Sequence, residues 1–269
     1  MSLPVFLAPP QDLAALRIGS TYVLAGPEGH HAAVVQRLRV GEELEIVDGA
    51  GHRLSGVITQ VAGREVHIEI SALHREDPAR PRITIVQGLI KGGGDEAIAA
   101  MTEAGVDEII PWQAQRSIAR WQASKAERAR LKWQTTAREA TKQARRAYVP
   151  QVRDVVQNQE LTEVIRAAMN AEAQSGLAQP AGTQSGEKLV LIAHESSADA
   201  LTHIAGIQDA AEVWCIIGPE GGISDAELEQ FTAAGARPVS LGPHVLRARN
   251  AGLVATSLLR ALTADREAQ

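Results

Sequence analysis

Apolar and polar side chains alternate in short runs along the first seventy residues, with glycine turns between the runs. Residues 44–47 lead into a turn at residues 48–51, and residues 53–61 are followed, after a second turn, by residues 66–70. A period of two is typical of strands that bury one face. Short strands with glycine turns in so small a module predict a little β-barrel, interrupted by one amphipathic helix at residues 30–39.

The pattern changes after two prolines, Pro78 and Pro81, which disfavour both a helix and a central strand. Short apolar runs typical of strands then alternate with helical stretches, and these runs are at residues 83–87, 106–110, 152–156, 189–193, 213–217 and 238–241. Alternating β and α elements predict a mostly parallel sheet covered by helices on both faces. We therefore expect an α/β fold in two domains, residues 1–76 and residues 82–269.

The composition is that of a folded protein, with 269 residues of which 45% are hydrophobic and 22% charged. These values exclude a wholly disordered chain, a collagen and a coiled coil. The apolar runs are much shorter than the roughly eighteen residues of a membrane span, and the first residues lack the basic stretch of a signal peptide. The sequence predicts a cytoplasmic protein with no membrane partner.

A metal site is not expected. The single cysteine, Cys215, excludes an internal disulfide and a cysteine-rich zinc site. The eight histidines are scattered, and the one adjacent pair, His30 and His31, points to different faces of the expected helix.

Charge is distributed unevenly along the chain. The formal net charge is −5, but residues 112–153 hold 11 Lys and Arg against 2 Asp and Glu. One basic stretch in an acidic protein indicates a localised face for a polyanion. The alternative is a solvated helix whose charges meet acidic residues elsewhere in the fold.

Two glycine-bearing loops follow late strands. The chain has no G-x-x-x-x-G-K-[ST] phosphate loop, no G-x-G-x-x-G after the first strand of the α/β half and no G-x-S-x-G elbow. Residues 217–222 read Ile-Gly-Pro-Glu-Gly-Gly and lead into a helix opened by the capping box of Ser224 and Glu227, and residues 241–247 read Leu-Gly-Pro-His-Val-Leu-Arg. Each loop alone is compatible with an ordinary connection. Together, at the carboxyl ends of strands, they predict a clamp for one flat ligand.

These two loops carry a family resemblance. The G-P-E-G-G-I-S segment followed by L-G-P-x-V-L-R is similar to the signature of the SPOUT methyltransferases, and most similar to the bacterial family that methylates uridine at N3 in 16S ribosomal RNA. The likeness spans nearly the whole chain and includes His30-His31, Arg37-Leu38-Arg39, Lys91-Gly92, Thr102-Glu103-x-Gly105-Val106, Arg116-Ser117, Glu139-Ala140 and Arg146.

The resemblance implies an N-terminal PUA-like RNA-binding β-barrel and a C-terminal SPOUT α/β domain with a trefoil knot. It also implies a homodimer packed through knot helices, and S-adenosylmethionine as the cofactor. Three loops would hold this cofactor, through Ala193, His194, Glu195, Ile217, Gly218, Pro219, Glu220, Gly221, Leu241, Gly242, Pro243, Val245, Leu246 and Arg247.

Methylation of N3 requires removal of its proton, so a guanidinium and a carboxylate are expected near the uracil. We expect Arg247 to stabilise the anionic base or position a phosphate, with a structural ion pair as the alternative. Glu103 and Glu139 are candidates for the proton acceptor, and the alternative for each is to orient an arginine. N3 lies on the Watson–Crick edge, so the target uridine must be unpaired or flipped out.

The expected partner is ribosomal RNA in the small subunit. The basic stretch and the barrel would bind it through Arg37, Arg39, Arg116, Arg120, Arg138, Lys142, Arg145 and Arg146. Trp112, Trp121 and Trp133 lie in the same stretch, where they either stack on bases or pack in a core.

One segment departs from the family pattern. Residues 248–251 read Ala-Arg-Asn-Ala where the family usually has Thr-[Glu/Ser]-Thr-Ala, so two hydroxyls are replaced and Arg249 stands beside the cofactor loop. This departure leaves two alternatives to the N3 methyltransferase. One is a non-catalytic RNA-binding or ribosome-assembly factor, and the other is a SPOUT enzyme with another RNA target.

Overall fold

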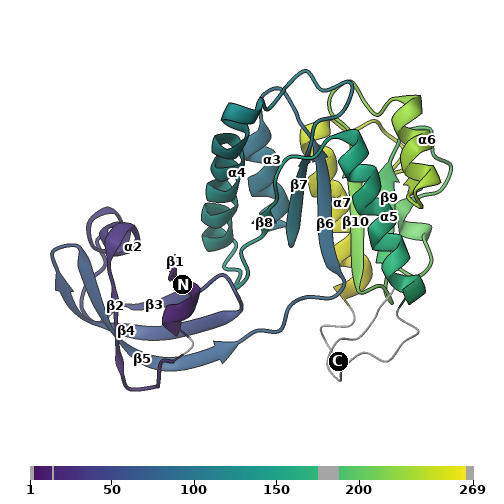
Figure 1. Cartoon of the computed structure of the whole chain (residues 1–269). Coiled ribbons are helices and arrows are strands. Elements are labelled where there is room, and N and C mark those ends of the chain that lie inside the picture. Colours follow the sequence, from purple (N-terminus) through teal and green to yellow (C-terminus); the bar gives the residue numbers. More distant parts are fainter. Residues whose placement is uncertain (1–2, 14, 175–187, 265–269) are drawn as a thin grey trace. The chain divides into compact units, whose positions relative to one another are not determined.

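The protein forms two compact units. The computed structural model describes residues 3–13, 15–174 and 188–264 (Figure 1). The first unit comprises residues 1–78 with 138–149, and the second comprises residues 79–137 with 150–269. The boundary after residue 78 lies within the proline-containing linker. Residues 138–149, which the strand and helix pattern assigns to the second domain, pack with the first unit instead.

The first unit is a five-stranded sheet in the order β1-β3-β4-β5-β2, parallel between β1 and β3 and otherwise antiparallel. Its elements are β1 (Val5–Leu7), α1 (Pro10–Leu13), β2 (Thr21–Leu24), α2 (Gly26–His30), the π-helical turn η1 (His31–Val35), β3 (Glu43–Val47), β4 (His52–Ala62) and β5 (Glu65–Arg75). The alternating runs of the sequence are therefore strands. The predicted helix lies earlier than expected, and Arg37, with φ of +56°, lies just beyond its end.

The core of the first unit follows the period of two. Leu44 and Ile46 on β3, Leu54 and Ile58 on β4, and the inward residues of β5 are almost completely buried together. Burial of one apolar face of this sheet is the main driving force for folding of the unit.

Residues 138–149 join the first unit through polar contacts. Lys142 Nζ lies 2.9 Å from Glu28 Oε1 and 2.8 Å from Glu139 Oε2, and the Lys142 side chain is 8% exposed. Arg53 donates to the Arg145 carbonyl at 2.8 Å. Burial opposes the charged form of Lys142, but hydrogen bonds with Glu139 and Glu28 outweigh it and raise the Lys142 pKa. Lys142 is therefore a structural ion-pair residue here, which corrects its assignment to an RNA-facing surface.

The second unit is a six-stranded, wholly parallel sheet in the order β11-β9-β10-β6-β7-β8. Its strands are β6 (Arg82–Gly88), β7 (Glu108–Trp112), β8 (Gln151–Val152), β9 (Lys188–Ala193), β10 (Glu212–Ile217) and β11 (Arg237–Val239). Its helices are α3 (Gly94–Glu103), α5 (Asn158–Gln174), the 3-10 turn η2 (Leu201–His203), α6 (Asp225–Ala233) and α7 (Ala248–Thr263), while α4 (Ala123–Gln143) has residues in both units.

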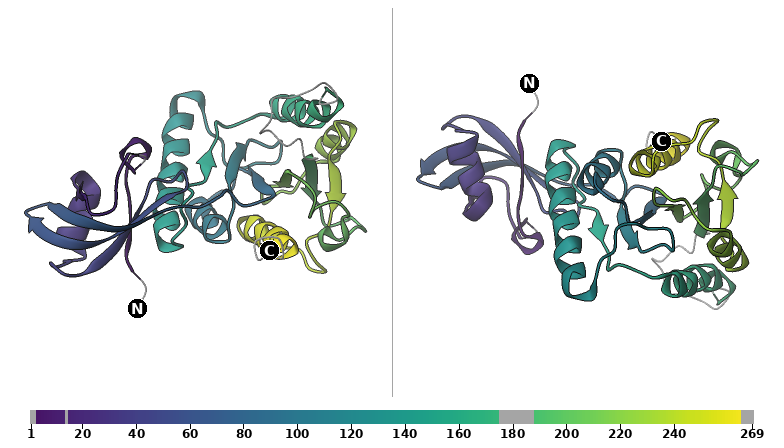
Figure 2. Two further views of the ribbon diagram at one scale, coloured as in Figure 1. Left: turned by 90° about the horizontal axis from the view of Figure 1, so that it is seen from below. Right: turned by 90° about the horizontal axis from the view of Figure 1, so that it is seen from above.

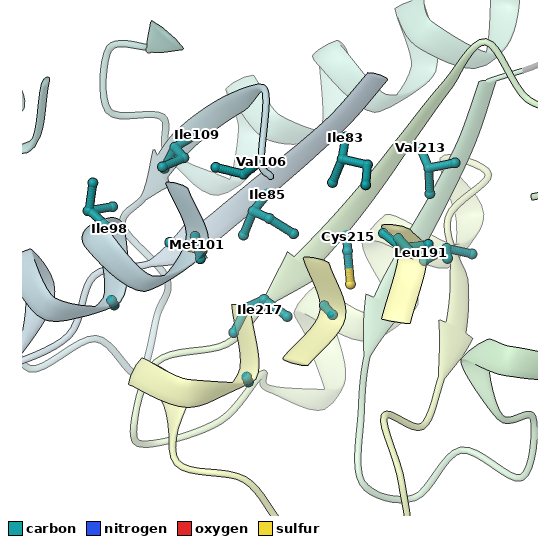
Figure 3. Close-up of a cluster of buried hydrophobic side chains, with 14 of the residues drawn as sticks. Ile83, Ile85, Ile98, Met101, Val106, Ile109, Leu191, Val213, Cys215 and Ile217 are labelled. Atoms are coloured by element: carbon teal, nitrogen blue, oxygen red, sulfur yellow. The ribbon is translucent and has the colours of Figure 1, made fainter. Parts of the chain in front are cut away.

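Helices cover both faces of this sheet, as expected (Figure 2). On one face, Ile98 and Met101 of α3 belong to a cluster of buried side chains that includes Cys215 of β10 (Figure 3). Ala255 and Leu259 of α7 belong to the same cluster. On the other face, α5 and α6 bury their apolar side chains against alternate strand residues. Burial raises the pKa of the Cys215 thiol to about 12, so this cysteine stays a neutral core residue.

The last helix returns across the sheet. β11 pairs with β9 at one edge, yet α7 packs against α3, β6 and β10. The approach is close, because a Cβ at Gly252 would lie 2.4 Å from Met101 Sδ. Such a return is part of the path that the expected trefoil knot would follow.

The three tryptophans of the basic stretch pack in the second unit. Trp112 is completely buried and its Nε1 donates to Asn158 Oδ1 at 2.8 Å. Trp133 is 6% exposed, and it packs edge-to-face with Trp121 at a ring distance of 4.8 Å. Core packing, rather than stacking on bases, accounts for these side chains. No helix in the described part of the chain is long and apolar enough to cross a membrane.

Replacement of Lys142 by Met should loosen residues 138–149. The variant leaves the largely buried Glu28 carboxylate without its cation, and we expect the opening free energy of this segment to fall by about 3 kcal/mol. Hydrogen–deuterium exchange of residues 138–149 measures it. Glu139→Gln is the matched control, because Glu139 is 59% exposed and its pairing should contribute less than about 1 kcal/mol. Equal protection in both variants would contradict the structural role of Lys142.

Candidate functional site

A cavity of about 580 Å³ lies at the carboxyl ends of the central strands of the second unit. Its walls are residues 90–92, 116, 193–195, 217–223, 245–249 and 251. This volume is within the range of about 300–1,000 Å³ typical of small-molecule sites. The end of an open parallel sheet is also where α/β proteins place ligands.

The loop after β10 is held against the end of β6 by main-chain contacts. A Cβ at Gly88 would lie 2.6 Å from the Pro219 nitrogen. At Gly221 it would lie 2.9 Å from the Arg116 carbonyl oxygen, and at Gly218 it would lie 2.9 Å from Ile223 Cγ1. Glycine is required at these positions because any side chain would displace the loop.

Glu227 fixes the end of the same loop. It forms the predicted capping box with Ser224, whose main-chain N–H and hydroxyl both donate to Glu227 Oε2 at 2.9 Å. The other oxygen of this buried carboxylate accepts from the Gln115 N–H at 2.6 Å and from Asn158 Nδ2 at 2.9 Å. One side chain thus connects the loop, the segment after β7 and the start of α5.

Two further contacts hold the cavity walls. Glu220 Oε1 accepts a hydrogen bond from the Lys91 main-chain N–H at 2.7 Å. Arg116 Nη1 donates to the carbonyls of Gly221 at 3.4 Å and Ile223 at 3.3 Å. The segment after β6 and the segment after β7 are therefore both connected to the glycine loop.

The second glycine loop lines a smaller neighbouring cavity of about 120 Å³, bounded by residues 193–195, 240–246 and 251. The two cavities share residues 193–195, 245, 246 and 251. Gly242 has φ of +148°, and no atom lies within 4 Å of its Cβ position, so backbone conformation rather than crowding favours glycine there.

All fourteen residues predicted to bind the cofactor line one of these two cavities. Arg247, the predicted catalytic arginine, also lines the larger one, as does Arg116 from the predicted RNA-binding set. The structure thus brings together three loops that are far apart in the sequence.

The two predicted proton acceptors are not among the cavity residues. Glu103 is exposed and is the last residue of α3. The first turn of this ten-residue helix follows the cavity residues 90–92, and a helix of this length rises by about 15 Å, which separates Glu103 from them. Glu139 lies in the first unit and pairs with Lys142. The carboxylates that do line the cavity are those of Glu195 and Glu220.

The other predicted RNA-binding residues differ in exposure. Arg37, Arg39, Arg120, Arg138 and Arg145 are exposed, and Arg146 is half-buried. Arg145 has φ of +54°, in the left-handed region, where its carbonyl accepts from Arg53.

Lys91 and Arg249 line the larger cavity, although the sequence did not place them in the site. The available signals were the Lys91-Gly92-Gly93-Gly94 run directly after a strand and the departure from the family pattern at Arg249.

Within the described ranges, no group of three or more His, Cys, Asp and Glu side chains is arranged to hold a metal ion.

Comparison with known proteins gives the family. Residues 76–260 match the model of an RNA methyltransferase domain, and residues 24–71 match that of an RNA methyltransferase PUA domain. Ribosomal RNA small subunit methyltransferase E of Mycobacterium bovis is 36% identical over 247 residues, which cover 91% of this chain and 88% of that protein. The chain belongs to the ribosomal RNA small subunit methyltransferase E family.

Other members of the methyltransferase E family extend the likeness. The Bacillus subtilis protein is 30% identical, over 89% of each chain. The crystal structure of the Neisseria gonorrhoeae protein bound to S-adenosyl methionine has a TM-score of 0.79 and 25% identity, and the match covers 97% of this chain and 98% of that one. The expected fold, a PUA-like unit followed by a SPOUT α/β unit, is confirmed, and the protein is an RNA methyltransferase.

Glu227→Gln should destabilise the second unit. Four groups donate hydrogen bonds to the Glu227 carboxylate, and in the variant an NH2 group replaces one of its two acceptor oxygens. This loss should lower the free energy of unfolding by about 3 kcal/mol. Tryptophan fluorescence during urea unfolding measures it, because all four tryptophans belong to the second unit. Glu229→Gln, on the exposed side of the same helix, is the control and should change the value by less than about 0.5 kcal/mol. Equal effects of the two substitutions would rule out the bridging role of Glu227.

Proposed function

We propose that this protein transfers a methyl group from S-adenosylmethionine to N3 of a uridine in 16S ribosomal RNA of the small subunit. The observation that carries the proposal is the cavity, in which every residue that the family resemblance assigns to the cofactor lines one connected set of walls. Family membership supplies the reaction class and the RNA substrate class.

The residues fit such a cofactor. Residues 217–221 border the cavity. The glycines at positions 88, 218 and 221 allow this loop to pack closely, because a Cβ at any of them would meet a neighbouring atom. Residues 193–195 and 241–247 would close the pocket from the other sides. When bound, the cofactor supplies an activated methyl group on a sulfonium.

The chain's own residues would prepare the uracil. Arg247 is exposed, lines the cavity and directly precedes α7, so its guanidinium can stabilise the uracil anion that forms when N3 loses its proton. Glu195 and Glu220 replace Glu103 and Glu139 as candidates for the proton acceptor, because only the former pair lines the cavity. Glu220 already accepts from Lys91, which leaves its second oxygen for this role.

RNA would be bound by both predicted domains, residues 1–76 and residues 82–269. The exposed arginines Arg37, Arg39, Arg120, Arg138 and Arg145 support this part of the proposal, and Lys142 no longer does. A uridine modified on its Watson–Crick edge has to be unpaired or flipped out of a helix.

We further propose a cytoplasmic homodimer. The partly exposed apolar side chains of Leu253, Val254 and Leu258 on α7 support a packing surface. Light scattering of the purified protein measures its mass, and a monomer at working concentration would contradict the dimer.

Small ribosomal subunits that lack the methyl group provide the direct test of the reaction. We expect labelled methyl from S-adenosylmethionine to appear in 3-methyluridine, identified by mass spectrometry of the nucleosides. Glu103→Gln and Glu139→Gln should retain transfer, while Arg247→Ala should lower it by about 10²-fold or more.

Other outcomes would change the account in defined ways. Label in a different nucleoside would make the protein a methyltransferase with another target. An RNA complex without any transfer would support the non-catalytic assembly factor.

A further inference from the structure

The larger cavity has a cationic rim, formed by Lys91, Arg116, Arg247 and Arg249. The carboxylates on the same walls are those of Glu195 and Glu220, one of which already accepts a main-chain hydrogen bond. Positive charge therefore exceeds negative charge on these walls, which favours an anionic ligand.

Three cations of the rim, Lys91, Arg116 and Arg249, line the larger cavity and not the smaller one. None of the three is among the fourteen residues that the family resemblance assigns to the cofactor. Arg116 already donates to main-chain carbonyls, which leaves Lys91 and Arg249 for a second ligand.

Arg249 is held there by packing rather than by an ion pair. A Cβ at Gly93 would lie 3.3 Å from Arg249 Cδ and 3.8 Å from its Nη1, so the arginine stem lies against the main chain before α3. Gly93 has φ of +69°, a conformation that glycine adopts without strain.

Among the described residues, the Arg249 guanidinium has no ion-pair partner. Glu96 Oε2 approaches the same Cβ position, at 3.5 Å, yet no carboxylate of the described residues forms an ion pair with Arg249. Within those residues, the Lys91 ammonium and the Arg247 guanidinium are likewise without an ion pair. Like charges on these three side chains repel each other, and an anion that binds between them would relieve the repulsion.

We propose that Arg249, together with Lys91, binds an RNA phosphate next to the target uridine and so orients the base toward the methyl donor. The proposal rests on the proposed function. A planar guanidinium binds phosphate oxygens through two parallel hydrogen bonds, and an ammonium adds a point charge. Phosphate contacts of this kind set register and orientation rather than sequence preference.

Two measurements with Arg249→Ala test the proposal. In steady-state methylation of small subunits, the Michaelis constant for the subunit should rise about tenfold, with S-adenosylmethionine affinity unchanged. In binding of a fluorescent single-stranded RNA between about 50 and 200 mM salt, the slope of log affinity against log salt should become shallower by about one.

Two matched variants complete the test. Arg249→Lys keeps the positive charge, so the salt slope should stay at the wild-type value. A purely structural role of the guanidinium would not predict this rescue by lysine. Arg166→Ala removes an exposed arginine of α5 outside the cavity and should behave as wild type.

Two results would overturn the proposal. One is an Arg249→Ala variant that matches Arg166→Ala in both the Michaelis constant and the salt slope. The other is a loss of S-adenosylmethionine affinity with an unchanged slope, which would make Arg249 a cofactor ligand. Failure of the proposed function gives a different result. The wild-type protein would then transfer no methyl group to uridine, whatever the salt dependence of its binding to the single-stranded RNA.

Discussion

The contact between the main chain of Gly88 and that of Pro219 is the constraint on which the functional end of the second unit depends. Gly88 is the last residue of β6, in the interior of the sheet, and Pro219 lies in the loop that follows the neighbouring strand β10. A Cβ on Gly88 would lie 2.6 Å from the Pro219 nitrogen, which leaves no room for a side chain. The loop can therefore take its observed course only while this position is glycine.

The rest of the site follows from that anchor. With the loop in place, Gly221 meets Arg116, Glu220 accepts from Lys91, and Glu227 connects the loop to the segments that follow β7. The return of α7 across the sheet then brings Arg247 and Arg249 to the same cavity. The rim thus combines side chains from the segment after β6, the segment after β7 and the start of α7.

The fold and the residues that gather around the two cavities could be predicted from sequence because local signals specify them. Period-two runs, capping boxes and glycine turns are properties of neighbouring residues, and the family motifs lie within two short loops. The helix expected at residues 30–39 was displaced because Arg37 has a left-handed backbone conformation, which no periodicity indicates.

The differences between expectation and structure concern contacts between distant parts of the chain. Lys142 was assigned to an RNA surface because it lies in a basic stretch, but its partner Glu28 is 114 residues away. Glu139 pairs with the same lysine, and Glu103 lies at the end of α3 remote from residues 90–92. Only the three-dimensional arrangement shows which carboxylates line the cavity and that Arg249 has no ion-pair partner among the described residues.

The Gly88 contact should shape the proposed cofactor site, and calorimetric titration of S-adenosylmethionine into the wild-type protein and into Gly88→Ala measures this effect. Overpacking at such a contact costs about 1–3 kcal/mol, so the dissociation constant of the variant should rise by about fivefold or more. Gly63→Ala, in the open turn between β4 and β5, is the control and should bind like the wild type. An unchanged dissociation constant in a folded Gly88→Ala variant would contradict the account.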